Sequence, residues 1–157
     1  MLASCTVRIE LRCRADAAYD LTFDTARFPA LFQGFGLVPP IRAIHSRGKW
    51  LRHVEVRGGA FDEWVTSARR PLPGPGWHAY LLRDLAPPLR WLVRSADACW
   101  TFTPLTDGCR VSWRYAFAPR GRWAAALVAA LLQTQMRPAM RRCLLALELE
   151  AARHPPF

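Results

Sequence analysis

The chain has 157 residues, of which 52% are hydrophobic and 22% are charged, and it contains seven tryptophans and eight phenylalanines. This composition excludes a disordered tail or a fibrous repeat, and the length predicts one globular domain, residues 1–157, that buries roughly two-thirds of its surface on folding. The net charge of +10 would attract nucleic acid or an anionic membrane. However, Lys49 is the only lysine among many Arg, Ala, Pro and Trp residues, which is typical of a GC-rich coding bias, so we expect no nucleic-acid partner.

The N-terminal segment, residues 4–14, alternates apolar and polar side chains. A period of two predicts a half-buried antiparallel strand. A secretion signal would instead show a basic start, a continuous apolar block and a small-residue cleavage site. The pattern therefore predicts a cytoplasmic protein.

Two short helices are predicted between residues 15 and 31. Asp16 and Thr25 are candidate N-caps, and Phe28-Pro29 interrupts any single long helix. The next segment, LFQGFGLVPPI at 31–41, combines glycines with consecutive prolines. We expect a loop there.

A meander of strands is predicted next, starting with residues 41–46, 51–57 and 60–68. Gly58-Gly59 is predicted as a two-residue hairpin turn between the second and third of these strands. That turn would place Arg52 opposite Val65 and diagonal to Glu63. Both charges would then share a face with Val54, Val56, Phe61 and Val65, whereas the other face would carry His53, Glu55, Asp62 and Trp64.

A further strand at about residues 77–84 precedes a loop around Pro87-Pro88 and a second hairpin built on Asp107-Gly108. In this register Trp100 would lie opposite Tyr115, Phe102 opposite Trp113 and Pro104 opposite Val111. The aromatic side chains would therefore share one face of the hairpin.

Residues 122–153 have the composition of a long helix, with a kink expected at Pro138. Its apolar stretch from Trp123 to Leu132 is much shorter than the roughly 20 residues that cross a bilayer. One stripe of this helix is expected to face the core, and it contains Met136, Met140, Cys143, Leu144 and Leu147.

This order of elements predicts an α+β fold in which a curved antiparallel sheet wraps around the C-terminal helix. The segments TVRIELRCRADAAYDLTFDTARFPALF, GGAFDEWV, CWTFTPLTDGCRVSWRYAF and LLQTQMRPAMRRCLLAL resemble the START-like, helix-grip superfamily. That superfamily includes polyketide cyclases and dehydratases, plant abscisic-acid receptors, and quinone- and lipid-binding proteins. The resemblance covers nearly the whole chain. It implies a deep, largely apolar cavity between sheet and helix that binds a hydrophobic small molecule.

The candidate cavity wall is aromatic and sulfur-rich. These side chains offer broad apolar surface and adaptable thioethers, although the same residues could simply fill a core. The wall residues are Trp100, Phe102, Trp113, Tyr115, Met136 and Met140.

Arg52, Glu63 and Tyr80 are the candidate polar residues of the site. A buried charge needs a partner, and a paired charge in an apolar cleft could hold a carbonyl or move a proton. The alternatives for Arg52 and Glu63 are a salt bridge at the rim or a register slip that exposes both. Tyr80 could donate to a ligand oxygen, and His53 and His78 are further acid–base candidates.

Three functions remain open at this point. The first is a binding or carrier protein for a lipid, quinone or polyketide, and the second is a cyclase- or dehydratase-like enzyme that uses Arg52 and Glu63. The third is a basic module that docks on an acidic partner or touches a membrane surface. The five cysteines contain no C-x-x-C pair, so we expect reduced thiols, no metal site and no cofactor.

Overall fold

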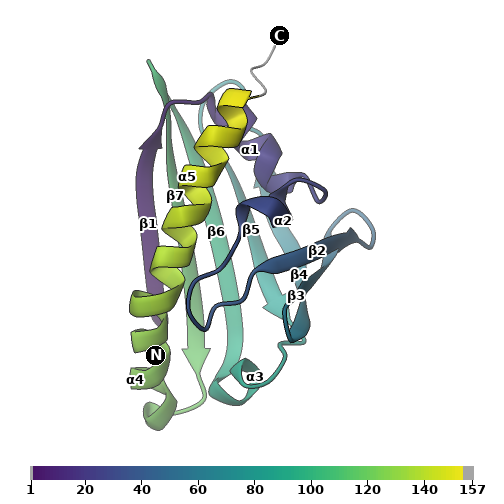
Figure 1. Ribbon diagram of the computed structural model, residues 1–157, viewed down its shortest axis with the longest axis vertical. Helices are drawn as coiled ribbons and strands as arrows, with labels where there is room; N and C mark the ends of the chain where they lie inside the picture. Colours follow the sequence, from purple (N-terminus) through teal and green to yellow (C-terminus); the bar gives the residue numbers. More distant parts are fainter. Residues whose placement is uncertain (1, 154–157) are drawn as a thin grey trace.

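The computed structural model describes residues 2–153, and its helices lie on one face of a seven-stranded antiparallel sheet (Figure 1). The strand order is β1-β7-β6-β5-β4-β3-β2. The predicted α+β helix-grip fold, with short helices after the first strand and a long C-terminal helix, is confirmed. In chain order the elements are β1 (Ala3–Leu11), α1 (Ala15–Phe23), α2 (Phe28–Leu31), β2 (Ile41–Ser46), β3 (Leu51–Val56), β4 (Gly59–Arg69), β5 (Gly76–Arg83), α3 (Leu89–Leu92), β6 (Val93–Leu105), β7 (Gly108–Pro119), α4 (Arg122–Leu131), η1 (Leu132–Met136) and α5 (Arg137–Arg153).

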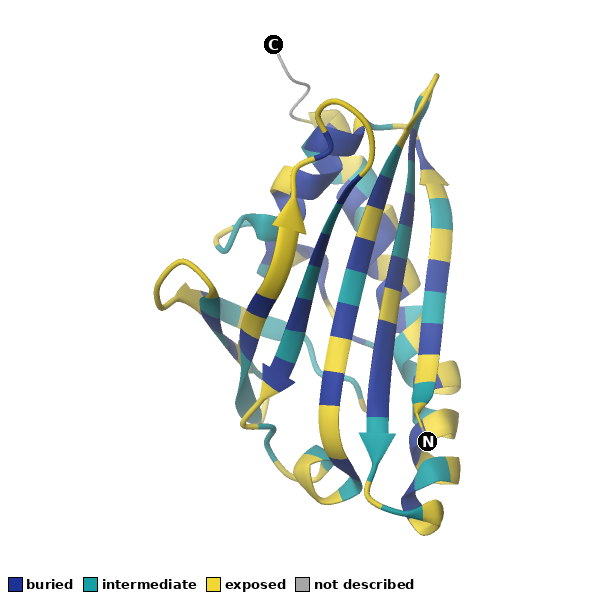
Figure 2. Ribbon diagram, turned by 180° about the vertical axis from the view of Figure 1, so that it is seen from behind, coloured by how far each residue is buried: buried dark blue, intermediate teal, exposed yellow. Residues whose placement is uncertain are grey.

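The core lies between α5 and the inner face of the sheet. Along much of β6 and β7, buried residues alternate with intermediate or exposed ones (Figure 2), because successive side chains of a strand point to opposite faces. On α5 the spacing of three and four residues brings one stripe onto the sheet. This stripe, whose members have 0% of their surface exposed, contains Met140, Cys143, Leu144 and Leu147.

The first helices differ from prediction at their caps. α1 begins at Ala15, so Asp16 lies inside its first turn and pairs with Arg14. Before α2 it is the Asp24 carboxylate, and not Thr25, that accepts the backbone N–H groups of Ala26 and Arg27. Ala26 and Arg27 lie in the turn before α2, so the carboxylate satisfies the backbone donors of that turn.

Both predicted hairpin registers are wrong by two residues. Arg57 and Gly58 form the first turn, with Gly58 at a φ of 86°, so Arg52 pairs with Glu63 directly. Thr106 and Asp107 form the second turn, so Trp100 pairs with Trp113. Because side chains alternate with a period of two, a shift of two residues changes the partners but keeps every side chain on its predicted face.

The C-terminal helical segment is continuous from α4 to α5, but one turn, η1, is π-helical. The Arg137 N–H reaches back to the carbonyl of Leu132, five residues earlier. Pro138 follows directly and has no N–H to donate, so one helical hydrogen bond is lost there. The irregular turn lies next to this proline and lets the helix continue past it. Between residues 2 and 153, no helix combines the length and the apolar character that a membrane-spanning segment requires.

Candidate ligand-binding site

Four polar side chains meet on the inner face of the sheet, and we call them the inner polar cluster: Arg52, Glu63, Tyr80 and Tyr115. The antiparallel register creates this cluster from four strands. Arg52 on β3 lies opposite Glu63 on β4, whereas Tyr80 on β5 and Tyr115 on β7 both pair with Ala98 of the strand between them. The small side chain of Ala98 leaves room for the two phenols to meet across it.

Arg52 and Glu63 form a buried ion pair. Arg52 Nη2 donates to Glu63 Oε2 at 2.6 Å, and the two residues are only 8% and 5% exposed. The guanidinium carbon also lies 5.4 Å from the ring centre of Phe23 and 6.0 Å from that of Tyr80. The structure therefore places both charges inside and not at the rim.

Two donors of Arg52 are left over. Within residues 2–153, its Nε and Nη1 are buried and have no hydrogen-bond partner. A buried donor without an acceptor carries its full desolvation cost, which is about 1–3 kcal/mol and higher for a charged group. An acceptor oxygen brought to this point would therefore be held strongly.

Burial raises the pKa of the Glu63 carboxyl, and the positive charge and hydrogen bond of Arg52 act in the opposite direction. Loss of hydration disfavours the charged form of a carboxyl group. The ionised Glu63 is therefore a stronger base than a carboxylate on the surface. This property suits a group that takes and returns a proton.

The two phenols of the cluster share a hydrogen bond. Tyr80 Oη lies 3.2 Å from Tyr115 Oη, and Trp100 Nε1 donates to Tyr80 Oη at 3.4 Å. Burial raises the pKa of both phenols, so both keep their protons at neutral pH. The mutual bond uses one of these two protons, which leaves the other for a ligand oxygen.

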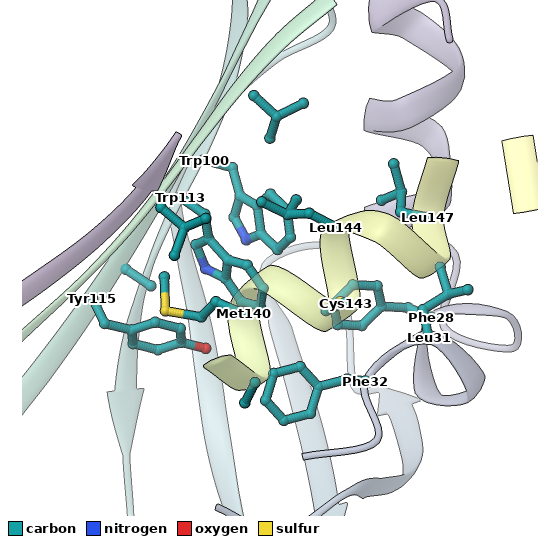
Figure 3. Packing of buried hydrophobic residues seen from close by; sticks show 14 of the residues in the cluster. Phe28, Leu31, Phe32, Trp100, Trp113, Tyr115, Met140, Cys143, Leu144 and Leu147 are labelled. Carbon is teal, nitrogen blue, oxygen red and sulfur yellow. The ribbon is translucent and has the colours of Figure 1, made fainter. Parts of the chain in front are cut away.

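The predicted wall residues Trp100, Trp113, Tyr115 and Met140 lie together in a packed core (Figure 3). The rings of Trp100 and Trp113 stack with centres 3.8 Å apart, and Phe32 packs edge-on against Trp113. Phe102 is nearly parallel to Trp100 at 6.0 Å. Met140 is fully buried, whereas Met136 is only partly covered at the end of η1.

The indole of Trp113 adds one more orphan donor. Its Nε1 is buried without a hydrogen-bond partner among the described residues. The ring centres of Trp113 and Tyr115 are 5.5 Å apart, so this donor belongs to the same region of the core as the phenols. Among the described residues, Trp113 Nε1 thus joins Nε and Nη1 of Arg52 as a buried donor without a partner.

His78 lies beside the cluster and is held as a neutral ring. It is 1% exposed, and its Nε2 lies 2.9 Å from Thr22 Oγ1. Thr22 donates its own proton to the Tyr19 carbonyl at 2.7 Å, so Nε2 must be the donor in the Thr22–His78 bond. The Nδ1 atom then has a buried lone pair without a partner in the described structure.

His53 is separate from the cluster. Its Nδ1 lies 2.7 Å from Asp62 Oδ1 on the outer face of the β3–β4 hairpin, and both side chains are 24% exposed. The two acid–base candidates among the histidines are therefore on opposite faces of the sheet. Within the described residues, no group of three His, Cys, Asp or Glu side chains could hold a metal ion.

We expect His78 to make the free energy of unfolding fall as the pH drops below about 6.5, where an unfolded histidine takes up a proton. Burial and the charge of Arg52 lower the pKa of His78 well below 6.5, so the His78 imidazole stays unprotonated in the folded protein at this pH. The loss should approach about 1.4 kcal/mol per pH unit. Urea unfolding of the wild type and His78→Phe at pH values from 7 to 5 measures it.

In that experiment the wild type should lose stability faster than His78→Phe as the pH falls. Thr22→Val is the matched control, because it removes the hydrogen bond but keeps the buried imidazole. It should lower stability at every pH and retain the wild-type slope. If the free energy of unfolding depended on pH equally in the wild type and His78→Phe, His78 would not be the cause of the loss at low pH.

The family model described as "Polyketide cyclase / dehydrase and lipid transport" matches residues 3–152. The chain belongs to this family. The START-like resemblance of the sequence is thereby confirmed, and membership supports a role in hydrophobic ligand binding or cyclisation. A search of curated proteins found no match.

Solved structures similar to this family member agree on the fold at low sequence identity. The di-domain ARO/CYC StfQ of the steffimycin biosynthetic pathway matches with a TM-score of 0.69 and 12% identity over 98% of this chain. This chain spans 52% of the length of StfQ. Norcoclaurine synthase from Thalictrum flavum, in complex with dopamine and hydroxybenzaldehyde, matches at 0.72 and 11%, covering 100% of this chain and 90% of its own.

A START superfamily protein from Mycobacterium smegmatis also matches, with a TM-score of 0.68 and 13% identity over 97% of both chains. At this identity the likeness establishes the helix-grip fold.

Thr22 and Phe23 of α1 and Phe32 after α2 reach the site in this polyketide cyclase/dehydrase family member, but sequence analysis missed them. No local pattern marks them, because the way the two short helices fold back over the sheet is a tertiary property.

Proposed function

We propose that residues 1–157 act as a single ligand-binding domain for a hydrophobic small molecule that carries a carbonyl or hydroxyl oxygen. The aromatic inner face would contact the apolar part of the ligand, and its oxygen would accept hydrogen bonds from Arg52. Family membership and fold support this class of ligand.

The observation that carries the proposal is the pair of orphan donors on Arg52, Nε and Nη1. A charge that serves stability alone is seldom kept in an apolar core, because well-packed apolar residues are often as stable. The spare phenolic proton of the Tyr80–Tyr115 pair would add a neutral donor. Together they favour a polarisable oxygen over a purely hydrocarbon ligand. Entry of the ligand would require the packed rings of Trp100, Phe32 and Trp113 to move apart.

A matched pair of probes tests this. We expect the wild type to bind 2-acetylnaphthalene at least roughly 10-fold more tightly than 2-ethylnaphthalene, which lacks the oxygen, because a hydrogen bond to a charged group contributes about 1.5–3 kcal/mol. Equilibrium dialysis measures both dissociation constants. The double variant Arg52→Met/Glu63→Leu removes the pair without leaving a lone charge and should bind both probes equally.

The control for this experiment is His53→Gln/Asp62→Asn, which removes the neighbouring pair on the outer face. It should keep the wild-type preference for the ketone. A preference that survives in the Arg52→Met/Glu63→Leu variant would place the recognition of the oxygen elsewhere.

A second function, cyclase-like catalysis, is favoured by the raised pKa of Glu63 next to the donors. Glu63 would take a proton from the carbon beside a carbonyl, and the electron pair left behind would form an enolate whose oxygen Arg52 holds. The enolate carbon would then attack a second carbonyl of the same molecule. The oxygen of that carbonyl would receive the proton back from Glu63, so an intramolecular aldol step balances.

A further inference from the structure

The outer side of α4 is apolar although it faces solvent. Trp123 is 68% exposed and Leu127 is 48% exposed, whereas Ala124 and Val128 face the core with 0% and 2% exposure. The remaining exposed positions of the helix beyond Arg122 are alanines, and no charged residue occurs between Trp123 and Met136. An exposed apolar face on a helix is typical of a site that binds another surface.

A second exposed tryptophan lies at the same end of the molecule. Trp91 of α3 is 62% exposed, and both figures that show the whole chain place α3 and α4 at one end (Figure 1). Two hydrogen bonds join α3 to the connection between β7 and α4: the Arg120 backbone N–H donates to the Leu92 carbonyl and Arg120 Nε to the Arg90 carbonyl, both at 2.9 Å. The two tryptophans therefore lie at the same end of the molecule, on helices that flank this hydrogen-bonded connection.

Several arginines lie at the same end of the molecule. A surface pocket of about 560 Å³ at the β5–β6 end is lined by Arg83, Arg90, Arg94 and Arg120, and Asp84 is the acidic residue in its wall. These four arginines and Arg122 form no ion pair with any residue in the described range. The end of the molecule thus combines unpaired positive charge with exposed tryptophan and leucine.

We infer that this end, formed by α3, the start of α4 and the arginine-lined pocket, docks on the surface of a bilayer that contains anionic lipids. Tryptophan rings favour the boundary between headgroups and acyl chains, and arginines attract lipid phosphates. Trp91, Trp123 and Leu127 enter the boundary, and the pocket receives a phosphate group.

A second copy of this chain is the alternative occupant, and the charges disfavour it. Docking about a twofold axis would bring the same arginines face to face, and the pocket wall offers one acidic residue against four arginines. An anionic lipid surface, in contrast, is complementary to both the charge and the apolar side chains. This surface is separate from the inner polar cluster, so the inference does not depend on the ligand bound there.

Sedimentation with sucrose-loaded vesicles tests the inference on the full chain. At 0.1 M salt the wild type should pellet with vesicles of 70% phosphatidylcholine and 30% phosphatidylserine, weakly with phosphatidylcholine alone, and hardly at all at 0.5 M salt. The variant Trp123→Ser/Leu127→Ser should bind at least roughly 10-fold more weakly. Arg90→Gln/Arg94→Gln should lose about 25-fold in affinity for the mixed vesicles, since each basic residue contributes about fivefold.

Trp64→Ser is the matched control, because Trp64 is 43% exposed on the outer face of β4. It should pellet like the wild type, and all variants should keep the far-UV circular dichroism of the wild type. The inference is overturned if the wild type fails to pellet with either vesicle, or if Trp123→Ser/Leu127→Ser binds as well as the wild type. It is also overturned if analytical ultracentrifugation shows that the wild type is a dimer and that Trp123→Ser/Leu127→Ser is a monomer.

Discussion

Replacing Arg52 with methionine should lower the free energy of unfolding by about 3–5 kcal/mol at neutral pH, because it leaves Glu63 as a lone charge in the core. Glu63 is 5% exposed and lies 2.6 Å from Arg52. The double variant Arg52→Met/Glu63→Leu should instead stay within about 1 kcal/mol of the wild type, or exceed it, because no unpaired charge remains. Urea unfolding followed by far-UV circular dichroism measures all three proteins.

The outer pair of the same hairpin supplies the control. His53 and Asp62 are each 24% exposed, so His53→Gln/Asp62→Asn should change stability by no more than about 1 kcal/mol. If the single and double variants at Arg52 and Glu63 were equally unstable, the pair itself would be a net source of stability. The argument that it is kept for binding would then fail.

Glu63→Gln should reduce proton exchange from a bound ketone by about 100-fold or more, since a positioned general base contributes typically 10²–10⁴ in rate. Glutamine keeps an oxygen for the Arg52 guanidinium but cannot take up a proton. The measurement is deuterium incorporation into the methyl group of 2-acetylnaphthalene in D₂O, followed by NMR, with the rate in buffer subtracted. Binding of the ketone by Glu63→Gln, measured by dialysis, should stay near the wild-type value.

Asp62→Asn is the matched control for exchange, because this carboxyl group is the sequence neighbour of Glu63 but lies on the outer face. It should leave the rate unchanged. If the wild type exchanges the ketone no faster than buffer does, the cyclase-like function is excluded for this probe class and simple binding remains. Equal rates in the wild type and Glu63→Gln would assign the proton transfer to another group.

The two experiments separate the roles of one ion pair. The first asks whether the pair stabilises the fold, and the second asks whether its carboxylate performs chemistry. A pair that adds little stability but controls ketone binding or exchange is what a functional site predicts. His78 is held neutral nearby, so its imidazole adds no charge that would compete with Arg52 for the ligand oxygen.

The alternation of apolar and polar side chains correctly predicts which strand residues lie on the inner face of the sheet and which lie on the outer face. Arg52 and Glu63, and the aromatic residues Trp100 and Trp113, lie inside as the sequence predicted, even though both hairpin turns were placed one residue too late. Glycine and aspartate allow a turn at more than one neighbouring position. The period of two tolerates that error, because a register shift by two residues preserves the face.

The cluster itself required the tertiary structure. Tyr80 and Tyr115 are 35 residues apart and meet only because both pair with Ala98 across β6. Phe23, Thr22 and Phe32 join the site through the way α1 and α2 fold over the sheet, and the orphan donors of Arg52 are visible only when burial and every neighbour are known.

The sequence by itself determined the fold class, the order of elements and the inward or outward direction of most strand residues, because these follow from local periodicity. Only the tertiary structure decided which inward side chains touch, that the wall residues pack against one another, and that the apolar outer side of α4 lies at the same end as Trp91 and four arginines. These features depend on contacts between distant segments. Such contacts are set by strand register and by helix packing on the sheet, and neither leaves a local pattern in the chain.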